Sequence, residues 1–272
     1  MLSSKQLRDI NGLQEICEKY EHIKLKLNWD LLETRNELEQ NDFFHYEGDK
    51  LVGFIGLYGF GTKIELCGMV HPHYRRKGIF SRLLKDALKE VKSRNVREVY
   101  INAPEKSESG KAFLKQFPCR FSFREYQMKW NEKQVSLEEG VHLRKATKTD
   151  FNLEIQLDVE CFGFLESEAR SYNEQIKREA NQDFFIIEQG SNAVGKVRIH
   201  RQKGESWIYG FSVLPRYQKQ GIGRKALKQM VFHEIQKGNE VHLEVQATNE
   251  HALKLYTWCG FQVYDAQDYY VV

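Results

Sequence analysis

Two stretches of the sequence match without a gap: HPHYRRKGIFSRLLK at residues 71–85 and LPRYQKQGIGRKALK at residues 214–228. Their prolines, their tyrosines and their first glycines all fall at one constant offset. Further upstream, a Val-Gly pair at Val52 matches one at Val194 at nearly the same offset. A repeat of this kind indicates that the chain is a diverged duplication.

The duplication sets the expected number of domains. We expect a first domain at 1–135 and a second at 136–272, which meet in the polar stretch NEKQVSLEEG at 131–140. Each half is long enough to form a hydrophobic core. Hydrophobic residues make up 41% of the 272 residues and there are only 4 prolines, so the chain is globular with little room for disordered linkers.

Composition excludes several classes of protein. The 41 Lys and Arg nearly balance the 38 Asp and Glu, and no nucleic-acid-binding motif is present, so we expect no nucleic-acid partner. The 5 cysteines are odd in number and lack paired spacing, which predicts neither a disulfide framework nor a structural zinc site. The charged N-terminal stretch has no signal-peptide core, and no apolar run is long enough to span a membrane. We therefore expect a cytoplasmic protein.

Hydrophobic period and turn residues predict the same order of elements in both halves. In the first half we expect helices at 4–20, 29–40, 78–93 and 107–116, and strands at 42–47, 51–58, 64–70, 96–102 and 121–130. In the second we expect helices at 148–161, 166–180, 221–236 and 250–259, and strands at 141–145, 183–188, 193–201, 206–213, 240–245 and 261–271. Antiparallel strands followed by a crossover helix predict an α/β fold, a mixed sheet covered by helices.

The loop after strand 206–213 carries the first candidate site. The backbone N–H groups at the start of the next helix, together with the helix dipole, favour an anion. Gly221 and Gly223 would let a diphosphate approach closely, and positive charge comes from Lys219, Arg224 and Lys225. The spacing lacks the third glycine of a dinucleotide-binding loop and the Lys-Ser/Thr of a P-loop. Alternatively, the glycines serve only the backbone geometry of the corner.

The helix expected at 250–259 carries the second candidate site. Asn249 suits the N-cap position and Gly260 the C-terminal stop. One face of this helix is apolar and consists of Ala252, Leu255, Tyr256 and Cys259. From this pattern alone, Tyr256 is better explained as one more core aromatic residue.

Together, the segments 213–223 and 249–261 resemble the acetyl-coenzyme A (acetyl-CoA) site of the GCN5-related N-acetyltransferase (GNAT) superfamily. The resemblance covers residues 184–271 well and, through the duplication, the first half more faintly, so the whole chain resembles a tandem GNAT protein. It implies two tandem acyl-CoA N-acyltransferase folds that use acetyl-CoA as cosubstrate and no metal. The acceptor would be a primary amine of a small molecule or peptide, and the protein a monomer or homodimer.

The resemblance also implies residue roles. The strand backbone at Phe211, Ser212 and Val213 would bind the pantetheine arm and polarise the acetyl carbonyl, and Asn249 would reach the pantetheine. The diphosphate would lie on the amides of Gln218, Lys219, Gln220, Gly221, Ile222, Gly223 and Arg224. Tyr256 would face the sulfur and act as general acid, because a tyrosine with a pKa near 10 stays protonated at neutral pH.

The general base and the acceptor site are less defined. Trp207 holds the place where the family often has a carboxylate, so the alternatives are Glu205, His242, Glu244 or a water chain. The acceptor would enter beside the loop at 160–168. We expect its acidic and aromatic residues to suit a cationic amine: Glu160, Phe162, Phe164, Glu166 and Glu168.

The first half departs from the family pattern. Phe80 stands at the position of Gly223, where a ring would obstruct the approach of a phosphate, and Phe113 or Leu114 stands at the position of Tyr256. We therefore expect the first half to be a non-catalytic lobe that helps to shape the acceptor cleft of the second. Two alternatives stay open for the whole protein: transfer of another acyl group, and an acyl-CoA-binding sensor or scaffold without turnover.

Overall fold

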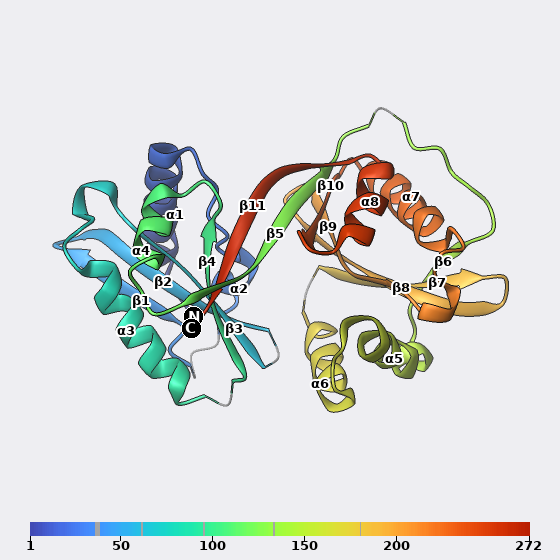
Figure 1. Ribbon diagram of the computed structural model, residues 1–272, viewed down its shortest axis with the longest axis horizontal. Coiled ribbons are helices and arrows are strands. Elements are labelled where there is room, and N and C mark those ends of the chain that lie inside the picture. The colour runs from blue at the N-terminus through green and yellow to red at the C-terminus, as the bar shows by residue number, and fades with distance from the viewer. Residues whose placement is uncertain (36–38, 61, 95, 133, 180) are drawn as a thin grey trace. The chain divides into compact units, whose positions relative to one another are not determined.

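The computed structural model describes residues 1–272 except 36–38, 61, 95, 133 and 180. The chain divides into two compact units, one formed by Met1–Arg124 with Asp265–Val272 and the other by Glu125–Tyr264 (Figure 1). Each unit is a mixed sheet with helices, so the expected α/β class and the two repeated folds are confirmed. In the part of the chain that the structure describes, no helix is both long and apolar enough to cross a membrane.

The first unit holds five strands in the order β1-β2-β3-β4-β11. Strands β3 and β4 are parallel, and β11 is an antiparallel neighbour of β4. The bounds of the elements that precede the second unit are α1 (Ser4–Glu21), α2 (Trp29–Glu33), β1 (Asp42–Glu47), β2 (Lys50–Phe60), β3 (Lys63–Val70), η1 (Pro72–Tyr74), α3 (Ile79–Lys92), β4 (Glu98–Pro104), α4 (Glu108–Leu114) and β5 (Arg120–Trp130).

The second unit repeats this plan with the order β5-β10-β9-β8-β7-β6. Strands β9 and β10 are the parallel pair, and β5 is the antiparallel neighbour of β10. The bounds are β6 (His142–Lys145), η2 (Lys148–Asp150), α5 (Phe151–Phe162), α6 (Glu166–Ile176), β7 (Gln182–Gln189), β8 (Asn192–Gln202), β9 (Glu205–Val213), η3 (Pro215–Tyr217), α7 (Ile222–Ile235), β10 (Glu240–Gln246), α8 (Glu250–Trp258) and β11 (Phe261–Val271).

The last strand of each sequence half pairs in the sheet of the other half. Residues 125–129 of β5 pair with β10, and residues 267–271 of β11 pair with β4. The compact units thus differ by this exchange from the halves 1–135 and 136–272, which follow the duplication. Sequence similarity identifies the repeated element, whereas the choice of sheet depends on pairing between distant residues.

Two expected helices end before the pattern indicates, and the one expected at 166–180 ends at Ile176. The helix expected at 29–40 ends at Glu33, and residues 36–38 lie outside the described part of the chain. Arg35, just beyond the end of α2, is buried and donates from Nη1 to Leu57 O at 2.6 Å. Its guanidinium lies 4.7 Å from the ring centroid of Tyr58 and pairs with Asp42. These contacts with β2 require the chain to leave the helix, which is a tertiary effect that local propensity does not include.

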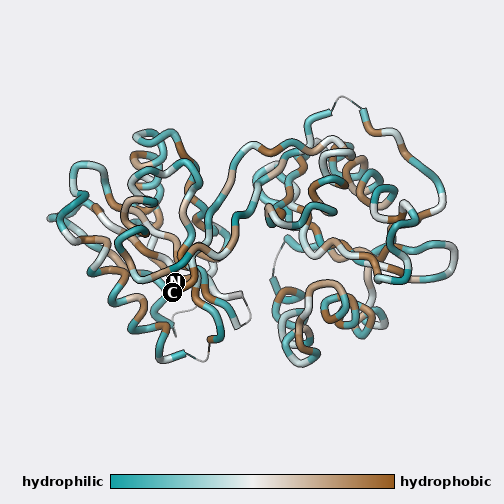
Figure 2. Tube along the Cα trace, viewed as in Figure 1, coloured by the Kyte–Doolittle hydropathy of each residue, from teal (hydrophilic) through white to brown (hydrophobic). Residues whose placement is uncertain are grey.

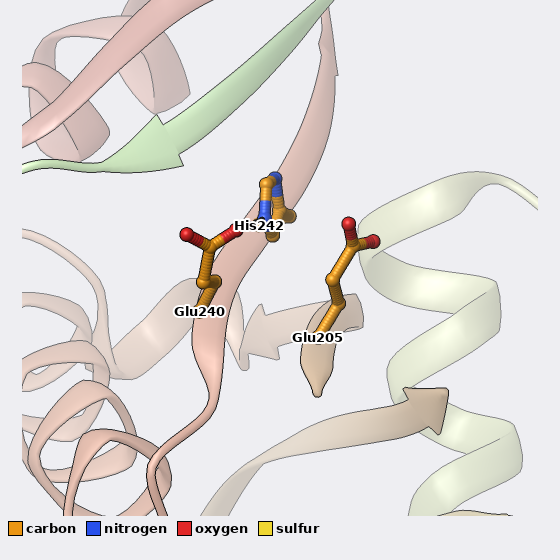
Figure 3. Close-up of side chains that lie close together, drawn as sticks. All are labelled: Glu205, Glu240 and His242. Carbon is orange, nitrogen blue, oxygen red and sulfur yellow. Dashed lines mark ion pairs between the residues drawn. The ribbon is translucent and has the colours of Figure 1, made fainter. Parts of the chain in front are cut away.

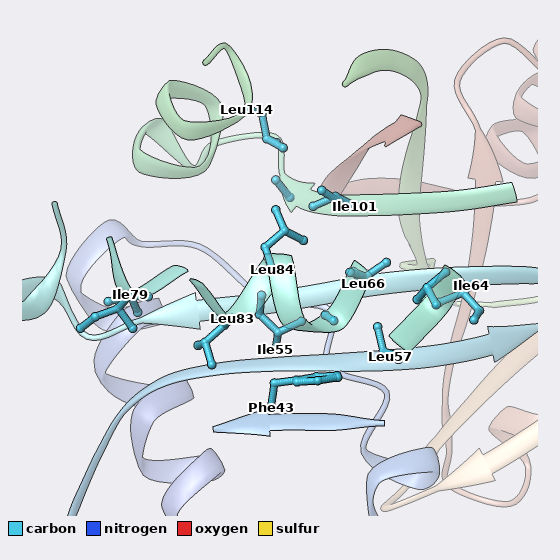
Figure 4. Packing of buried hydrophobic residues seen from close by; sticks show 14 of the residues in the cluster. Phe43, Ile55, Leu57, Ile64, Leu66, Ile79, Leu83, Leu84, Ile101 and Leu114 are labelled. Carbon is cyan, nitrogen blue, oxygen red and sulfur yellow. The ribbon is translucent and has the colours of Figure 1, made fainter. Parts of the chain in front are cut away.

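The core of the first unit lies between the sheet and α3. The helix faces the sheet with residues spaced by helical turns, among them Ile79, Leu83 and Leu84 (Figure 4). They pack against apolar side chains of β2, β3 and β4, such as Ile55 and Ile101. Hydrophobic and hydrophilic residues alternate along this helix in Figure 2, in keeping with its one buried face. Helices α1 and α2 contribute to a separate cluster with residues of β2 and β3.

The parallel strands of each unit separate before they end. Pairing of β9 with β10 runs from Glu205 with Glu240 to Ile208 with Leu243, and no pair follows among the described residues. A register shift against β8 marks a bulge in β9 directly after this point, at Gly210 with φ 55°. Beyond the last pair, the edge of β9 that faces β10 is therefore available to bind a ligand. In the first unit, β3 and β4 separate in the same way after Leu66 and Ile101.

Candidate active site

The loop between β9 and α7 presents unpaired backbone amides. Lys219 has φ 60° and Gly221, the N-cap of α7, has φ 77°, so the chain makes two left-handed turns here. Helix geometry leaves the amides of the first turn without a carbonyl partner. The amide of Gln218 differs, because it donates to Pro215 O at 3.2 Å. The unpaired amides of the loop that is predicted to bind an anion therefore begin at Lys219.

Gly223 faces the interior of the second unit, and its predicted role at the diphosphate stays a prediction. A Cβ at this position would lie 3.5 Å from Leu255 and 3.8 Å from the ring of Phe211, which is the space between β9 and α8. A side chain at this position would thus point into the unit toward Phe211, where a Cβ would make ordinary van der Waals contacts. At Gly221, in contrast, a Cβ would meet nothing closer than Arg224, at 4.0 Å. Gly221 is required by its left-handed backbone.

Arg224, one of the basic residues beside the loop, is already paired. Arg224 makes a short ion pair with Glu138, which also accepts from Lys228 Nζ at 3.1 Å. The guanidinium of Arg224 lies 4.9 Å from the ring centroid of Trp258, which is 71% exposed. These contacts hold Arg224 at the first turn of α7, where an added phosphate would compete with Glu138 for it.

Helix α8 places Tyr256 in the core of the second unit. The side chain of Asn249 caps the helix and accepts from Ala252 N at 3.1 Å, as the sequence indicates. Tyr256 is buried and packs against Phe261, with ring centroids 6.1 Å apart. Burial, with a smaller contribution from Cys259, raises the pKa of the Tyr256 hydroxyl to about 12. Because its hydroxyl donates to none of the described residues, Tyr256 holds an uncommitted proton at neutral pH.

The strand backbone predicted to hold the pantetheine arm lies in the separated part of β9. Ser212 is buried, and its hydroxyl has no hydrogen-bond partner of good geometry among the described residues. The neighbouring carbonyl of Val213 accepts from Gln218 Nε2 at 2.8 Å and from the thiol of Cys161 at 3.5 Å. A buried hydroxyl without a partner is costly unless a ligand supplies one, so this edge fits a polar ligand.

Two of the candidate bases form one cluster with Glu240. Figure 3 shows Glu205 at the start of β9, and Glu240 and His242 at the start of β10. His242 is buried between the ring of Trp207, 4.9 Å away, and the edge-on ring of Tyr264. Its Nε2 lies 3.6 Å from Glu240, and neither ring nitrogen has a hydrogen-bond partner of good geometry among the described residues.

The environment of His242 suits a proton acceptor. Burial lowers the pKa of the imidazole, which keeps the ring neutral near pH 7, while Glu205 and Glu240 oppose the shift. The third candidate, Glu244, lies further along β10 and accepts from Gln127 Nε2 at 3.0 Å. Of the three side chains, the imidazole is the buried one, and its ring nitrogens have no hydrogen bond of good geometry among the described residues.

The donor atoms of Glu205, Glu240 and His242 lie within 4.8 Å of one another, a spacing that a metal ion could use. Both carboxylates already have partners. Lys129 Nζ lies 2.6 Å from Glu240, and Trp207 Nε1 donates to Glu205 at 2.9 Å. The two carboxylates are therefore paired without a metal ion, and the absence of a metal requirement stays a prediction.

The residues of the acidic loop that is expected to receive the acceptor make separate contacts and do not form one cluster. Glu168 accepts from the backbone of Leu165 at 3.2 Å and so serves the start of α6, while the side chain of Glu166 is 76% exposed. Phe162 is half exposed, and Phe164 stacks on Tyr172 at 5.6 Å. Glu160 accepts from its own helix.

Sequence reasoning missed an aromatic surface on β9. Tyr209 lies stacked between Trp207, 6.4 Å away, and the guanidinium of Arg198, 4.9 Å away. The alternation Glu205, Trp207, Tyr209 on one face of a strand was the signal that could have revealed it. This surface ends where β9 and β10 separate.

The fold and this site define a class of protein: a duplicated α/β transferase in which parallel strands separate beside an amide-lined helix start. The chain belongs to the acetyltransferase (GNAT) family, whose model matches residues 8–116 and 151–261. Both repeats thus belong to the family, as the sequence resemblance implied.

Two curated relatives share part of this sequence. The spermine/spermidine N(1)-acetyltransferase of Bacillus subtilis (strain 168) is 36% identical over 63 residues, which are 22% of this chain and 41% of that protein. The probable spermine N(1)-acetyltransferase of Bacillus subtilis subsp. natto is 35% identical over the same shares. The chain thus matches less than half the length of either relative.

Solved structures share the whole fold at low sequence identity. A GCN5-related N-acetyltransferase from Sphaerobacter thermophilus is 17% identical with a TM-score of 0.78, and the match covers 97% of this chain and 91% of that one. A tandem GNAT protein from the clavulanic acid biosynthesis pathway is 13% identical with a TM-score of 0.71, covering 100% and 96%. The tandem architecture is therefore shared by known proteins.

Proposed function

We propose that the protein transfers the acetyl group of acetyl-CoA to a primary amine by direct attack, and that the second unit is the catalytic one. One observation carries the proposal: the second unit combines a cradle of unpaired amides, a separated strand edge and a buried, protonated Tyr256. The GNAT family membership supports acyl transfer as the reaction class.

The residues of the second unit fit the proposed cosubstrate. The amides from Lys219 to Arg224 would hold the diphosphate at the positive end of α7. The free edge of β9 at 211–213 would bind the amides of the pantetheine arm, and the partnerless hydroxyl of Ser212 lies there. Asn249 would contact the same arm from the start of α8, because its carbonyl oxygen alone is used by the cap.

Tyr256 would supply the proton for the departing thiolate. A thiol in water has a pKa near 8.5, well below that of the buried tyrosine. Burial raises thiol pKa values too, as it does for Cys259 in the same helix, whose pKa is raised to about 11. In this environment the two groups are close enough in acidity for proton transfer. The backbone amides at 211–213 would stabilise the charge that develops on the carbonyl oxygen.

The amine must be neutral to attack, so a group has to take its proton. His242 fits this role best of the candidates, because it is neutral, buried and without a hydrogen-bond partner in the described residues. Glu205 and Glu240 beside it would stabilise the charged ring that results. Water can link His242 to the amine, since a base may act through one water.

We further propose a cationic amine, such as a polyamine, as acceptor. Two Bacillus subtilis relatives are named as spermine or spermidine acetyltransferases. The aromatic face of Trp207 and Tyr209 and the exposed carboxylate of Glu166 are groups that attract alkylammonium ions. Acetyl-CoA is the expected donor, and a larger acyl group would need more room at the end of β9.

The test is thiol release from acetyl-CoA in the presence of a panel of amines that includes spermine, spermidine, glucosamine and a lysine-containing peptide. We expect turnover with at least one amine and an acetylated product of matching mass. Binding of acetyl-CoA without turnover of any amine would favour a sensor or scaffold. If acetyl-CoA does not bind at all, the proposed function is wrong.

A further inference from the structure

The segment at 135–141 joins β5 to β6 and runs beside α7 of the same unit (Figure 1). Near its start, Val135 packs against the core of the second unit. At its end, the carbonyl oxygen of Val141 accepts from Gln229 Nε2 of α7 at 2.7 Å. The segment is thus anchored at both ends, and we call residues 135–141 the strap.

Glu138 reaches from the middle of the strap to the start of α7. One of its carboxylate oxygens accepts from Arg224 Nη2, and the other accepts from Lys228 Nζ at 3.1 Å. The hydrogen bond from Lys228, together with the charges of both basic residues, lowers the pKa of the Glu138 carboxyl below its usual value. The ionised carboxylate therefore neutralises positive charge in the first two turns of the helix that is proposed to bind the diphosphate.

The guanidinium of Arg224 lies beside the first turn of α7. Its Nη2, the atom that donates to Glu138, is 4.0 Å from where a Cβ of Gly221 would be, and Gly221 is the N-cap of this helix. Its Nε is buried and has no hydrogen-bond acceptor among the described residues. Arg224 thus has an unused donor next to the unpaired amides of the loop, and this donor could serve a second anion.

The ion pair between Glu138 and Arg224 is not needed to hold the strap or the helix. The two side chains are 28% and 29% exposed, and pairs with such exposure contribute little to stability. The strap has its own anchors at Val135 and Val141. In the first unit, Ser81 stands at the position of Arg224, and α3 forms with an uncharged side chain there. The fold of the repeat therefore does not explain the pair.

A phosphate group is the stronger partner for Arg224. It carries up to two negative charges and three acceptor oxygens, and the first-turn amides and the helix dipole attract it as well. The carboxylate of Glu138 then weakens phosphate binding in either arrangement. It gives up its hydrogen bond from Arg224, or it stays beside a second anion and repels it.

We propose that Glu138 is an intramolecular competitor for the phosphate groups of CoA. In the free protein the strap holds this carboxylate against Arg224 and Lys228, and a bound phosphate takes its place. Glu138 thereby weakens the binding of CoA and speeds the release of the product, a step that limits the rate of many enzymes. The competition rests on the proposed function, which supplies its ligand.

The test compares Glu138→Gln with Glu139→Gln. Glu139 is the neighbouring carboxylate of the strap, is exposed and makes no ion pair among the described residues, so its variant loses the same charge without changing the contacts of Arg224. Both changes lie at the surface, so both variants should melt as the wild type does. Titration calorimetry with CoA at fixed ionic strength measures the affinity. The dissociation constant should fall about twofold to fivefold in Glu138→Gln, the range expected when one partly exposed ion pair is released, and stay unchanged in Glu139→Gln.

A double-mutant cycle tests which groups Glu138 competes for. Replacing both Arg224 and Lys228 with Gln removes the contested cations, so adding Glu138→Gln to that background should give no further gain in affinity. An equal gain with and without the two cations would contradict the competition. Titration with dephospho-CoA assigns the phosphate: a gain for CoA alone identifies the 3′-phosphate, and a gain for both ligands identifies the diphosphate.

Other outcomes separate this inference from the proposed function. A weaker affinity for CoA in Glu138→Gln would show that Glu138 positions Arg224 for the ligand, which overturns the competition. An equal gain in Glu139→Gln would overturn it too, because net charge alone would then account for the effect. If CoA binds neither the wild type nor Glu138→Gln, the proposed function and the competition are both wrong. The expected gain without acetyl transfer to any amine would contradict the catalytic proposal alone.

Discussion

The side chain of Gln218 donates from Nε2 to Val213 O at 2.8 Å, which ties the start of the phosphate loop to the end of β9. In the first unit, Arg75 Nε makes the corresponding bond to Val70 O at 3.0 Å. The loop of each unit thus takes its position from the last carbonyl of the strand before it. A different side chain does the same task in each, so the sequence comparison alone does not reveal it.

This contact predicts a loss of affinity in Gln218→Met, which keeps the length of the side chain but removes the donor. A hydrogen bond of this kind contributes about 0.5–1.5 kcal/mol. If the loop geometry depends on it, the dissociation constant for acetyl-CoA at the second-unit site should rise about threefold to tenfold. Titration calorimetry of the wild type and the variant measures it. Gln236→Met, at the far end of α7, should bind as the wild type does.

Tyr256→Phe should slow the reaction and leave cosubstrate binding nearly unchanged. The substitution removes only the hydroxyl of a buried ring, so packing against Phe261 stays. Loss of a general acid costs about 10²- to 10⁴-fold in rate, and we expect kcat to fall within this range. Tyr126→Phe removes a hydroxyl elsewhere in the second unit and should keep full activity. A Tyr256→Phe enzyme as fast as the wild type would show that another group protonates the thiolate.

The dependence of kcat/KM on pH should show the protonation of His242. Because burial lowers its pKa below the ordinary value, the ring is in the accepting form at pH 7, and kcat/KM should fall only as the pH drops below about 6.5. His242→Gln should lose this acidic limb and most of the activity at neutral pH. The groups that face the ring are Glu205, Glu240 and Lys129. If Glu244→Gln removes the limb instead, the base is that carboxylate.

The interactions of Glu234 lead to a prediction of how the stability of the second unit changes in acid. It is fully buried on α7 and accepts from Arg201 at 2.6 and 2.7 Å and from Ser206 at 2.7 Å. Burial by itself would raise the pKa of this carboxyl, but these hydrogen bonds outweigh it and hold the pKa well below the usual range. The carboxylate therefore contributes stability above the unfolded pKa, near 4.5, and this contribution fades as the pH falls through the folded value.

Glu234→Gln removes one of the two carboxylate partners of Arg201, the buried one, while Asp183 stays, and should destabilise the fold by about 3–5 kcal/mol at pH 7. The gap in the free energy of unfolding between variant and wild type should narrow in acid, as measured by urea titrations at pH 7 and pH 3. Glu250→Gln, an exposed position, should change stability little. An equal gap at both pH values would contradict a folded pKa below the usual range.

If the loop at 160–168 binds the acceptor, removal of its carboxylates should change KM for the acceptor and not KM for acetyl-CoA. Replacing Glu160, Glu166 and Glu168 with Gln should raise KM for a polyamine by about tenfold, because three charges near a cation are lost, and should leave KM for acetyl-CoA unchanged. Steady-state kinetics with both substrates varied measures this split. Glu174→Gln, on the exposed side of α6, serves as the control. Unchanged kinetics in the triple variant would remove this loop from the acceptor site.

The sequence was sufficient to predict three local features: the loop motif, the helix start at Gly221 and the position of Tyr256 on an apolar helix face. Each depends on residue spacing within about ten residues. The inward orientation of Gly223 and of the Phe80 ring could not be predicted, because each depends on contacts with other elements of the same unit. In the sequence, a phenylalanine in place of a glycine predicts a blocked loop. In the structure, its ring lies against Gly68 and Phe113, and the loop stays open.

The sequence by itself determined the duplication, the mixed α/β fold of each repeat and the family, because helix period, turn residues and the repeated loop are local patterns. Only the tertiary structure decided that β5 and β11 exchange sheets, that His242 joins Glu205 and Glu240, and that Glu138 pairs with Arg224. These features depend on strand pairing and burial among residues far apart in the chain. Local propensity carries no information about such long-range contacts.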